Sequence, residues 1–115
     1  MVIFEHKSSD KVILGGSDIP TSVEVTIYEK VAGDTYLINI PSLNIHINTR
    51  KKEEIDDLVH STVMSFFRFW KQKQGIPRFY DHMLALGFSI RSDENHDTAR
   101  ENFNGKKLKK NYSVV

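Results

Sequence analysis

The middle of the chain, residues 23–74, alternates apolar and polar side chains in three successive runs and then changes to helical periodicity. The first two runs flank Gly33-Asp34, a pair typical of a two-residue hairpin turn in which glycine takes a positive φ. The third run follows Pro41, which cannot donate a ladder hydrogen bond and so marks the end of the second strand. This order predicts an α+β fold in which a mostly antiparallel sheet of three to four strands carries one long helix on one face.

A two-residue turn also fixes which residues lie opposite each other in the hairpin. It places Ala32 opposite Thr35 and Glu29 opposite Ile38. One face of the hairpin then collects the apolar residues Val25, Ile27, Val31, Tyr36, Ile38 and Ile40. The other face is mostly polar and is expected to meet water or a partner; it carries Glu24, Thr26, Tyr28, Lys30, Leu37 and Asn39.

Residues 50–74 are predicted to form the long helix. Its apolar side chains recur at the spacing of one buried stripe, at positions Ile55, Leu58, Val59, Val63, Phe66, Phe67 and Trp70. Acidic side chains gather in its first turns and basic ones in its last turns, as the helix dipole favours. Gly75 and Pro77 are predicted to end it. A shorter helix over residues 79–86, with Gly87 as its left-handed cap, is expected to follow.

Three segments make up the predicted domain organisation. Residues 1–22 form an N-terminal extension, in which two short apolar runs predict a hairpin. Residues 23–91 form the α+β domain, which ends with a short strand over residues 88–90. Residues 92–115 are polar and basic, lack sustained periodicity and are predicted to be a mobile tail.

The composition excludes several classes of protein. With 115 residues the chain suits one domain with one core. It has no cysteine, which excludes disulfides, thiolate nucleophiles and cysteine-based zinc sites. No apolar run approaches the roughly 18 residues of a membrane-spanning helix, and the first residues do not predict a signal peptide. We therefore expect a cytoplasmic protein that does not associate with membranes.

No catalytic or nucleotide-binding motif is found in the sequence: P-loop, dinucleotide-binding, metalloprotease and nucleophile-elbow patterns are all absent. The histidines are scattered over separate predicted elements and do not predict a metal site; they are His6, His46, His60, His82 and His96. Apart from Glu29, which the hairpin register places on the apolar face, no buried carboxylate suited to acid–base catalysis is expected. The sequence therefore predicts a protein that is not an enzyme, with no catalytic residue, no cofactor and no metal.

The end of the long helix is rich in large rings, namely Phe66, Phe67, Phe69 and Trp70. Core packing is the expected role for most of them. Four rings within five positions nevertheless exceed what a short three-stranded sheet face covers, so part of this surface is predicted to bind a partner. The residues expected to contact that partner are Phe67 and Trp70 on the helix and Tyr28 and Leu37 on the sheet.

Basic side chains concentrate near the C-terminus. Residues 99–115 hold five basic residues against one acidic residue, a net charge of +4, which leaves −3 for residues 1–98 out of the formal total of +1. An acidic body with a basic tail can bind nucleic acid or an acidic partner. The alternative function is therefore a small nucleic-acid-binding regulatory protein that acts through Lys106, Lys107, Lys109 and Lys110.

The order of these features resembles the HicB-like antitoxin domain, a partial ribonuclease H-like fold. The resemblance spans residues 23–77 and depends on the Gly33-Asp34 hairpin, the segment Ile40-Pro41-Ser42-Leu43, a third strand, and a long helix that begins after Thr49 and contains Glu53-Glu54. It implies a non-catalytic domain, because this family lacks the carboxylate set of working ribonuclease H enzymes.

For function, the resemblance implies protein binding. HicB-like proteins bind and mask a small toxin with a double-stranded-RNA-binding-like fold, are often oligomeric, and in many cases carry a separate DNA-binding segment. No helix-turn-helix or ribbon-helix-helix pattern follows Pro77 in this chain. We therefore expect a non-catalytic interaction module that forms a homodimer and binds a partner protein, with an RNA-cleaving toxin as the partner that the resemblance implies.

Overall fold

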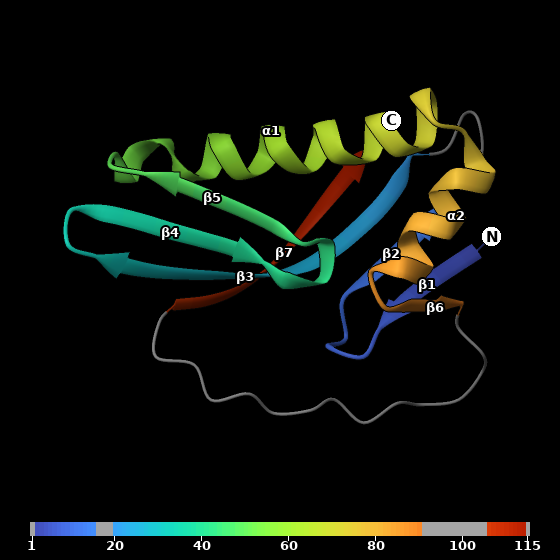
Figure 1. Ribbon diagram of the computed structural model, residues 1–115, viewed down its shortest axis with the longest axis horizontal. Coiled ribbons are helices and arrows are strands. Elements are labelled where there is room, and N and C mark those ends of the chain that lie inside the picture. The colour runs from blue at the N-terminus through green and yellow to red at the C-terminus, as the bar shows by residue number, and fades with distance from the viewer. Residues whose placement is uncertain (1, 16–19, 91–105, 115) are drawn as a thin grey trace.

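The computed structural model describes residues 2–15, 20–90 and 106–114, in which one seven-stranded sheet packs against helices (Figure 1). The strands are β1 (Val2–His6), β2 (Lys11–Leu14), β3 (Thr21–Ala32), β4 (Thr35–Ile40), β5 (Ile45–Thr49), β6 (Phe88–Ile90) and β7 (Lys106–Val114). The helices are α1 (Ile55–Arg68) and α2 (Ile76–Ala85), with short 3-10 helices η1 (Pro41–Leu43) and η2 (Lys52–Glu54) and a π-helix η3 (Phe69–Lys73). The predicted α+β class, with antiparallel strands and a long helix, is confirmed.

The sheet divides into two arms at β3. One edge of β3 pairs with β7 over residues 21–29. β2 pairs with residues 22–24 and β4 with residues 28–32. Because Glu24 pairs with both β2 and β7, and Glu29 pairs with both β4 and β7, β2 and β4 share the edge of β3 opposite to β7. The sheet therefore forks there: β2, β1 and β6 continue in one arm, β4 and β5 continue in the other, and residues 25–27 lie between them.

The hairpin between β3 and β4 confirms the predicted register. Ala32 pairs with Thr35 and Glu29 pairs with Ile38, and Gly33 has a φ of 65°. Most of the predicted apolar face belongs to the core, including Val25, Ile27, Ile38 and Ile40. Val31 differs: it lies beside the turn, at the far end of the hairpin, and is 57% exposed.

The long helix changes type along its length. The 3-10 helix η2 leads into α1, and α1 leads into the π-helix η3, so residues 52–73 are helical throughout. In α1 the buried side chains recur every four residues along the predicted stripe; they are Ile55, Val59, Val63 and Phe67. The other predicted members of the stripe, Leu58, Phe66 and Trp70, are half-buried. The helix ends where predicted, at Gly75, which has a φ of 90°.

The second helix begins earlier than predicted. α2 starts at Ile76 instead of residue 79, because Pro77 is compatible with a first helical turn, where its missing N–H would have no intrahelical partner. At the other end Gly87 has a φ of 98° and its N–H donates to the Leu84 carbonyl at 3.0 Å. The predicted left-handed glycine cap is therefore confirmed, as is the strand that follows it.

Both flanks of the chain extend the sheet beyond the predicted three to four strands. The N-terminal hairpin forms as β1 and β2, but it belongs to the common sheet instead of forming a separate extension. The prediction of a mobile tail is wrong for residues 106–114, which form β7; residues 92–105 lie outside the described residues. In β7 the apolar residues Leu108, Tyr112 and Val114 share one face. This period-2 pattern was not recognised in the sequence because lysines interrupt it.

One core holds the sheet and both helices together. Phe79 of α2 contacts Phe4 of β1 with ring centroids 5.6 Å apart, and Phe67 of α1 at 6.1 Å. All three rings are fully buried. Leu43 also belongs to this core, but from η1 and not from a strand as predicted. In the described part of the chain, no helix has the length and apolar content needed to cross a membrane.

Candidate functional site

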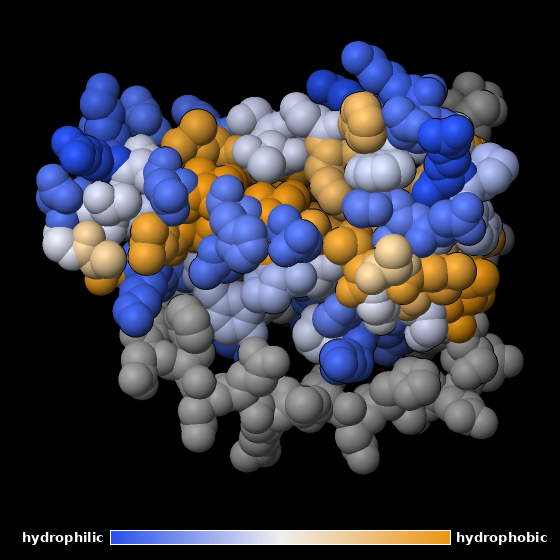
Figure 2. All heavy atoms as spheres, in the orientation of Figure 1, coloured by the Kyte–Doolittle hydropathy of each residue, from blue (hydrophilic) through white to orange (hydrophobic). Residues whose placement is uncertain are grey.

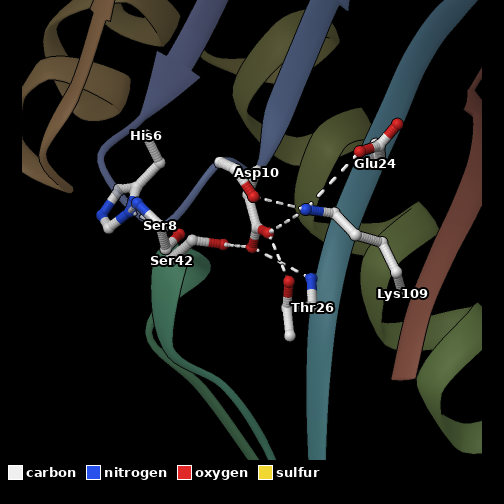
Figure 3. Close-up of polar contacts among 8 residues, drawn as sticks. His6, Ser8, Asp10, Glu24, Thr26, Ser42 and Lys109 are labelled. Atoms are coloured by element: carbon white, nitrogen blue, oxygen red, sulfur yellow. Dashed lines mark hydrogen bonds and ion pairs between the residues drawn. The ribbon is translucent and has the colours of Figure 1, made fainter. Parts of the chain in front are cut away.

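The gap between the two arms of the sheet is filled by the Asp10 carboxylate (Figure 3). Asp10 directly precedes β2 and is 1% exposed. It accepts hydrogen bonds from the Thr26 N–H at 3.0 Å, from Thr26 Oγ1 at 2.7 Å and from Ser42 Oγ at 2.6 Å. Thr26 lies in the stretch of β3 that neither β2 nor β4 pairs with. The carboxylate therefore replaces a missing strand partner for this backbone N–H.

Lys109 completes the cluster from the other edge of β3. It lies opposite Thr26 on β7, and its Nζ is 3.7 Å from Asp10 Oδ1, 3.5 Å from Glu24 Oε1 and 2.6 Å from Ser9 Oγ. The carboxylate of Asp10 thus meets three hydrogen-bond donors and one ammonium group, which accounts for its acceptor positions. We infer that the cluster stabilises the fork and does not present a reactive group.

Asp10 also corrects an expectation from the sequence. Glu29, the one carboxylate expected on the apolar face, is only half-buried and lies opposite Lys106 in the β3–β7 register. The buried carboxylate is Asp10, which reads as a turn residue because it follows Lys7-Ser8-Ser9. Its partners are 16 and 32 residues away in sequence, so no local pattern points to it.

His6 makes a second polar contact close to this cluster. The Ser8 N–H donates to His6 Nδ1 at 3.2 Å, and Ser8 Oγ lies 2.7 Å from the same nitrogen. With Nδ1 as acceptor, we assign the proton to Nε2, which donates to the Leu86 carbonyl at 3.2 Å. A Cβ at Gly87 would lie 3.2 Å from His6 Nε2, so the glycine allows this close approach. His6 therefore fastens β1 to the end of α2.

A partly exposed ring cluster lies where η3 meets α2. Trp70 of η3 and His82 of α2 stack with centroids 3.9 Å apart and planes 11° apart. Phe69 meets the Trp70 ring edge-on at 5.2 Å and is 43% exposed. A surface hollow of about 370 Å³ is lined by Trp70, Arg78, Asp81 and His82. We call these four residues the aromatic hollow.

Exposed apolar side chains continue along α2 beyond the aromatic hollow. Ile76, at the start of α2, is 41% exposed, and Leu84, near its end, is 51% exposed. Ile90 on the neighbouring β6 is 54% exposed. Figure 2 shows apolar spheres gathered over the end of α2 and β6. Contiguous apolar surface of this kind is typical of interaction sites.

The sequence-predicted partner residues do not come together in the structure. Phe67 is fully buried and Tyr28 is 7% exposed, so neither offers a free surface, and this part of the prediction is corrected. Leu37 is half-buried on the outer sheet face. Trp70 is half-buried and lines the aromatic hollow. Its neighbour Phe69, one of the four rings expected mostly to pack in the core, is the ring that reaches the surface.

The basic residues of the predicted tail are divided between two faces of β7. Lys109 binds the fork cluster, and Lys107 lies 5.7 Å from the Tyr28 ring centroid on the same face. On the opposite face Lys110 Nζ lies 3.3 Å from Asp56 Oδ1 of α1. Burial, and the Asp56 charge beside it, raise the pKa of Tyr112 on that same face. The predicted lysine cluster is therefore not one continuous basic surface.

The described residues contain no group of three or more metal-ligating side chains. His6, His46, His60 and His82 lie in separate places, and His96 lies outside the described residues. His46 Nδ1 lies 2.7 Å from Asn39 Oδ1, and His60 contacts the Tyr112 ring at 5.8 Å.

No family model, curated protein or solved structure matches this chain. The resemblance to the HicB-like domain therefore stays a prediction.

The pH dependence of stability tests the contact between Trp70 and His82. Burial lowers the pKa of His82 from its ordinary value of 6.5, so the folded state favours the neutral imidazole. Its contribution to stability is full above pH 6.5 and is lost as the pH falls towards the folded pKa, because the unfolded chain takes up the proton first. Denaturant unfolding at pH 7.5 and 5.5 should show a smaller loss in His82→Gln than in wild type. Trp70 is the only tryptophan, so its fluorescence reports the transition.

Equal losses of stability between pH 7.5 and 5.5 in wild type and His82→Gln would contradict a lowered pKa for His82 in the folded state. Arg78 and Asp81, which line the same hollow, are present in both proteins, so the comparison isolates the contribution of His82.

Proposed function

We propose that this protein is a non-catalytic interaction module that binds a partner protein through the aromatic hollow and Phe69. The observation that carries the proposal is the stacked Trp70–His82 pair beside an exposed Phe69. Tryptophan, tyrosine and arginine dominate binding energy at protein interfaces, and anchors of this kind bind in desolvated pockets. Trp70 and Arg78 lie on one hollow, with Asp81 as a second charged group for orienting a partner.

The ring contacts also favour binding through preorganisation. Trp70 is held by His82 on one side and by Phe69 at its edge, and Phe66 lies 5.5 Å from His82. A ring that is already fixed loses little side-chain entropy when a partner covers it. Covering the exposed part of Phe69 removes further apolar surface from water. Both effects support a binding surface over a purely structural role for these rings.

In its more specific form, the proposal is a HicB-type antitoxin that masks an RNA-cleaving toxin and forms a homodimer. Its support is the order of hairpin, third strand and long helix, together with the exposed aromatic surface. We also propose that the protein acts in the cytoplasm.

The alternative, nucleic-acid binding through the lysines of β7, has less support. Lys109 and Lys110 are engaged in ion pairs with Asp10, Glu24 and Asp56. Lys107, which is exposed, makes no ion pair within the described residues. Binding through four phosphate contacts would give a steep dependence of affinity on salt.

Coexpression with the products of adjacent genes tests the proposed function. We expect one of these products to arrest growth when it is expressed alone, and the arrest to be relieved when this chain is coexpressed. The two proteins should then copurify as a complex through size-exclusion chromatography. If every adjacent gene product leaves growth unchanged and elutes separately from this chain, the antitoxin proposal is wrong.

A further inference from the structure

The outer edge of β7 is a long strand edge. β7 has nine residues, and within the described part of the chain it pairs with β3 and with no other strand. Its second row of N–H and C=O groups can therefore pair with an added strand, a common mode of peptide recognition. On the face away from the helices its side chains are exposed, including Lys107, Lys109, Asn111 and Ser113.

The charge of this edge indicates which strand it fits. The sequence of β7, Lys106 to Val114, contains four lysines and no acidic residue. Lys107 makes no ion pair within the described residues and is exposed. The Asp56 partner of Lys110 has a side chain that is 84% exposed, and such surface pairs contribute little. Opposite charges directly across two strands stabilise their pairing, whereas like charges oppose it.

We propose that the outer edge of β7 binds an extended acidic peptide segment by strand addition. Lys107 and Lys109 lie two residues apart on one face, so acidic side chains at alternate positions of the segment would lie opposite them. The apolar side chains of the segment, at the intervening positions, would lie on the helix side of the sheet. There they would lie beside Leu108 and Tyr112, which are half-buried. The expected ligand is therefore a segment of about nine residues that alternates acidic and apolar side chains, matching the length of the strand.

An acidic peptide fits this edge better than a nucleic acid does. A phosphate backbone needs several cations that converge on one side, whereas the lysines of β7 alternate between both faces of the sheet. Strand addition uses the backbone for affinity and needs the lysines only for selectivity.

A fluorescent ten-residue peptide of alternating glutamate and valine, with blocked ends, tests this proposal by fluorescence anisotropy. We expect saturable binding to the full chain that weakens as salt rises from 50 to 500 mM. A peptide with lysine in place of glutamate should not bind. A peptide with an N-methyl group on every residue should also lose binding, because it has no backbone N–H to donate on either edge.

Matched charge variants locate the binding edge. Lys107→Glu should weaken the peptide about fivefold or more, as expected for reversing one cross-strand charge pair, and Lys107→Ala should weaken it less. Lys73→Glu changes the net charge equally at an exposed residue of η3 and should bind like wild type. Circular dichroism is used to confirm that each variant is folded.

Three results would overturn the proposal: no binding of the glutamate peptide, equal affinity for its N-methylated form, or equal effects of Lys107→Glu and Lys73→Glu. A ten-residue oligothymidylate that binds more tightly than the peptide and loses affinity in Lys107→Glu would also overturn it, in favour of nucleic-acid binding. Because this edge is separate from the aromatic hollow, none of these outcomes decides whether the proposed function is correct. The coexpression experiment tests that function separately.

Discussion

Replacing Phe67 by alanine is expected to lower the free energy of unfolding by about 3–5 kcal/mol, the usual loss when a buried phenylalanine is truncated in a core. Phe67 is fully buried and contacts the Phe66 ring at 4.9 Å and the Phe79 ring at 6.1 Å. Its removal would leave a cavity between α1 and α2, and the surrounding rings have little freedom to fill it.

Phe69 is the matched control, two residues along the same helix. It is 43% exposed, so Phe69→Ala is expected to cost less than about 1 kcal/mol. Urea unfolding followed by circular dichroism measures the free energy of unfolding of each variant and of wild type. Similar losses for the two variants would show that Phe69 belongs to the core and that the surface assigned to it is wrong.

Replacing Asp10 by alanine is expected to cost about 3 kcal/mol, because one substitution removes the acceptor of three buried hydrogen bonds. The Thr26 N–H has no strand partner on that edge within the described residues, so it would be left unsatisfied. The ion pair with Lys109 adds little to this loss, since the Lys109 side chain is 39% exposed.

Two milder substitutions separate the hydrogen-bond acceptor role of Asp10 from the effect of its negative charge. Asp10→Asn keeps one carbonyl acceptor and should lose less than Asp10→Ala. Glu24→Gln affects only the partly exposed pair with Lys109 and should change the free energy of unfolding by less than about 1 kcal/mol. A loss below about 1 kcal/mol for Asp10→Ala would mean that the fork does not depend on this carboxylate.

Local signals account for the parts of the fold that the sequence predicts correctly. The β3–β4 register follows from a two-residue turn, in which Gly33 has the positive φ that the turn requires. α1 follows from a four-residue apolar period, and its end follows from Gly75. Each of these features depends on residues close together in the chain.

Features formed by distant residues were not predictable from local patterns. β7 pairs with β3 between residues that are 77 to 93 positions apart in the sequence, and its lysines conceal the apolar face that contacts α1. Asp10 looks like a turn residue until the fork brings Thr26 and Ser42 to it. Trp70 was found through the density of rings, whereas His82 was missed because its contact depends on how α2 turns back along η3.

The central claim, that the aromatic hollow and Phe69 bind a partner protein, is tested most directly by the dissociation constant of the copurifying partner for three proteins. We predict that Phe69→Ala weakens binding about tenfold relative to wild type, the loss expected for an interface anchor. Lys73→Ala, at an exposed residue that does not line the hollow, should bind like wild type. Equal dissociation constants for wild type, Phe69→Ala and Lys73→Ala would contradict the claim.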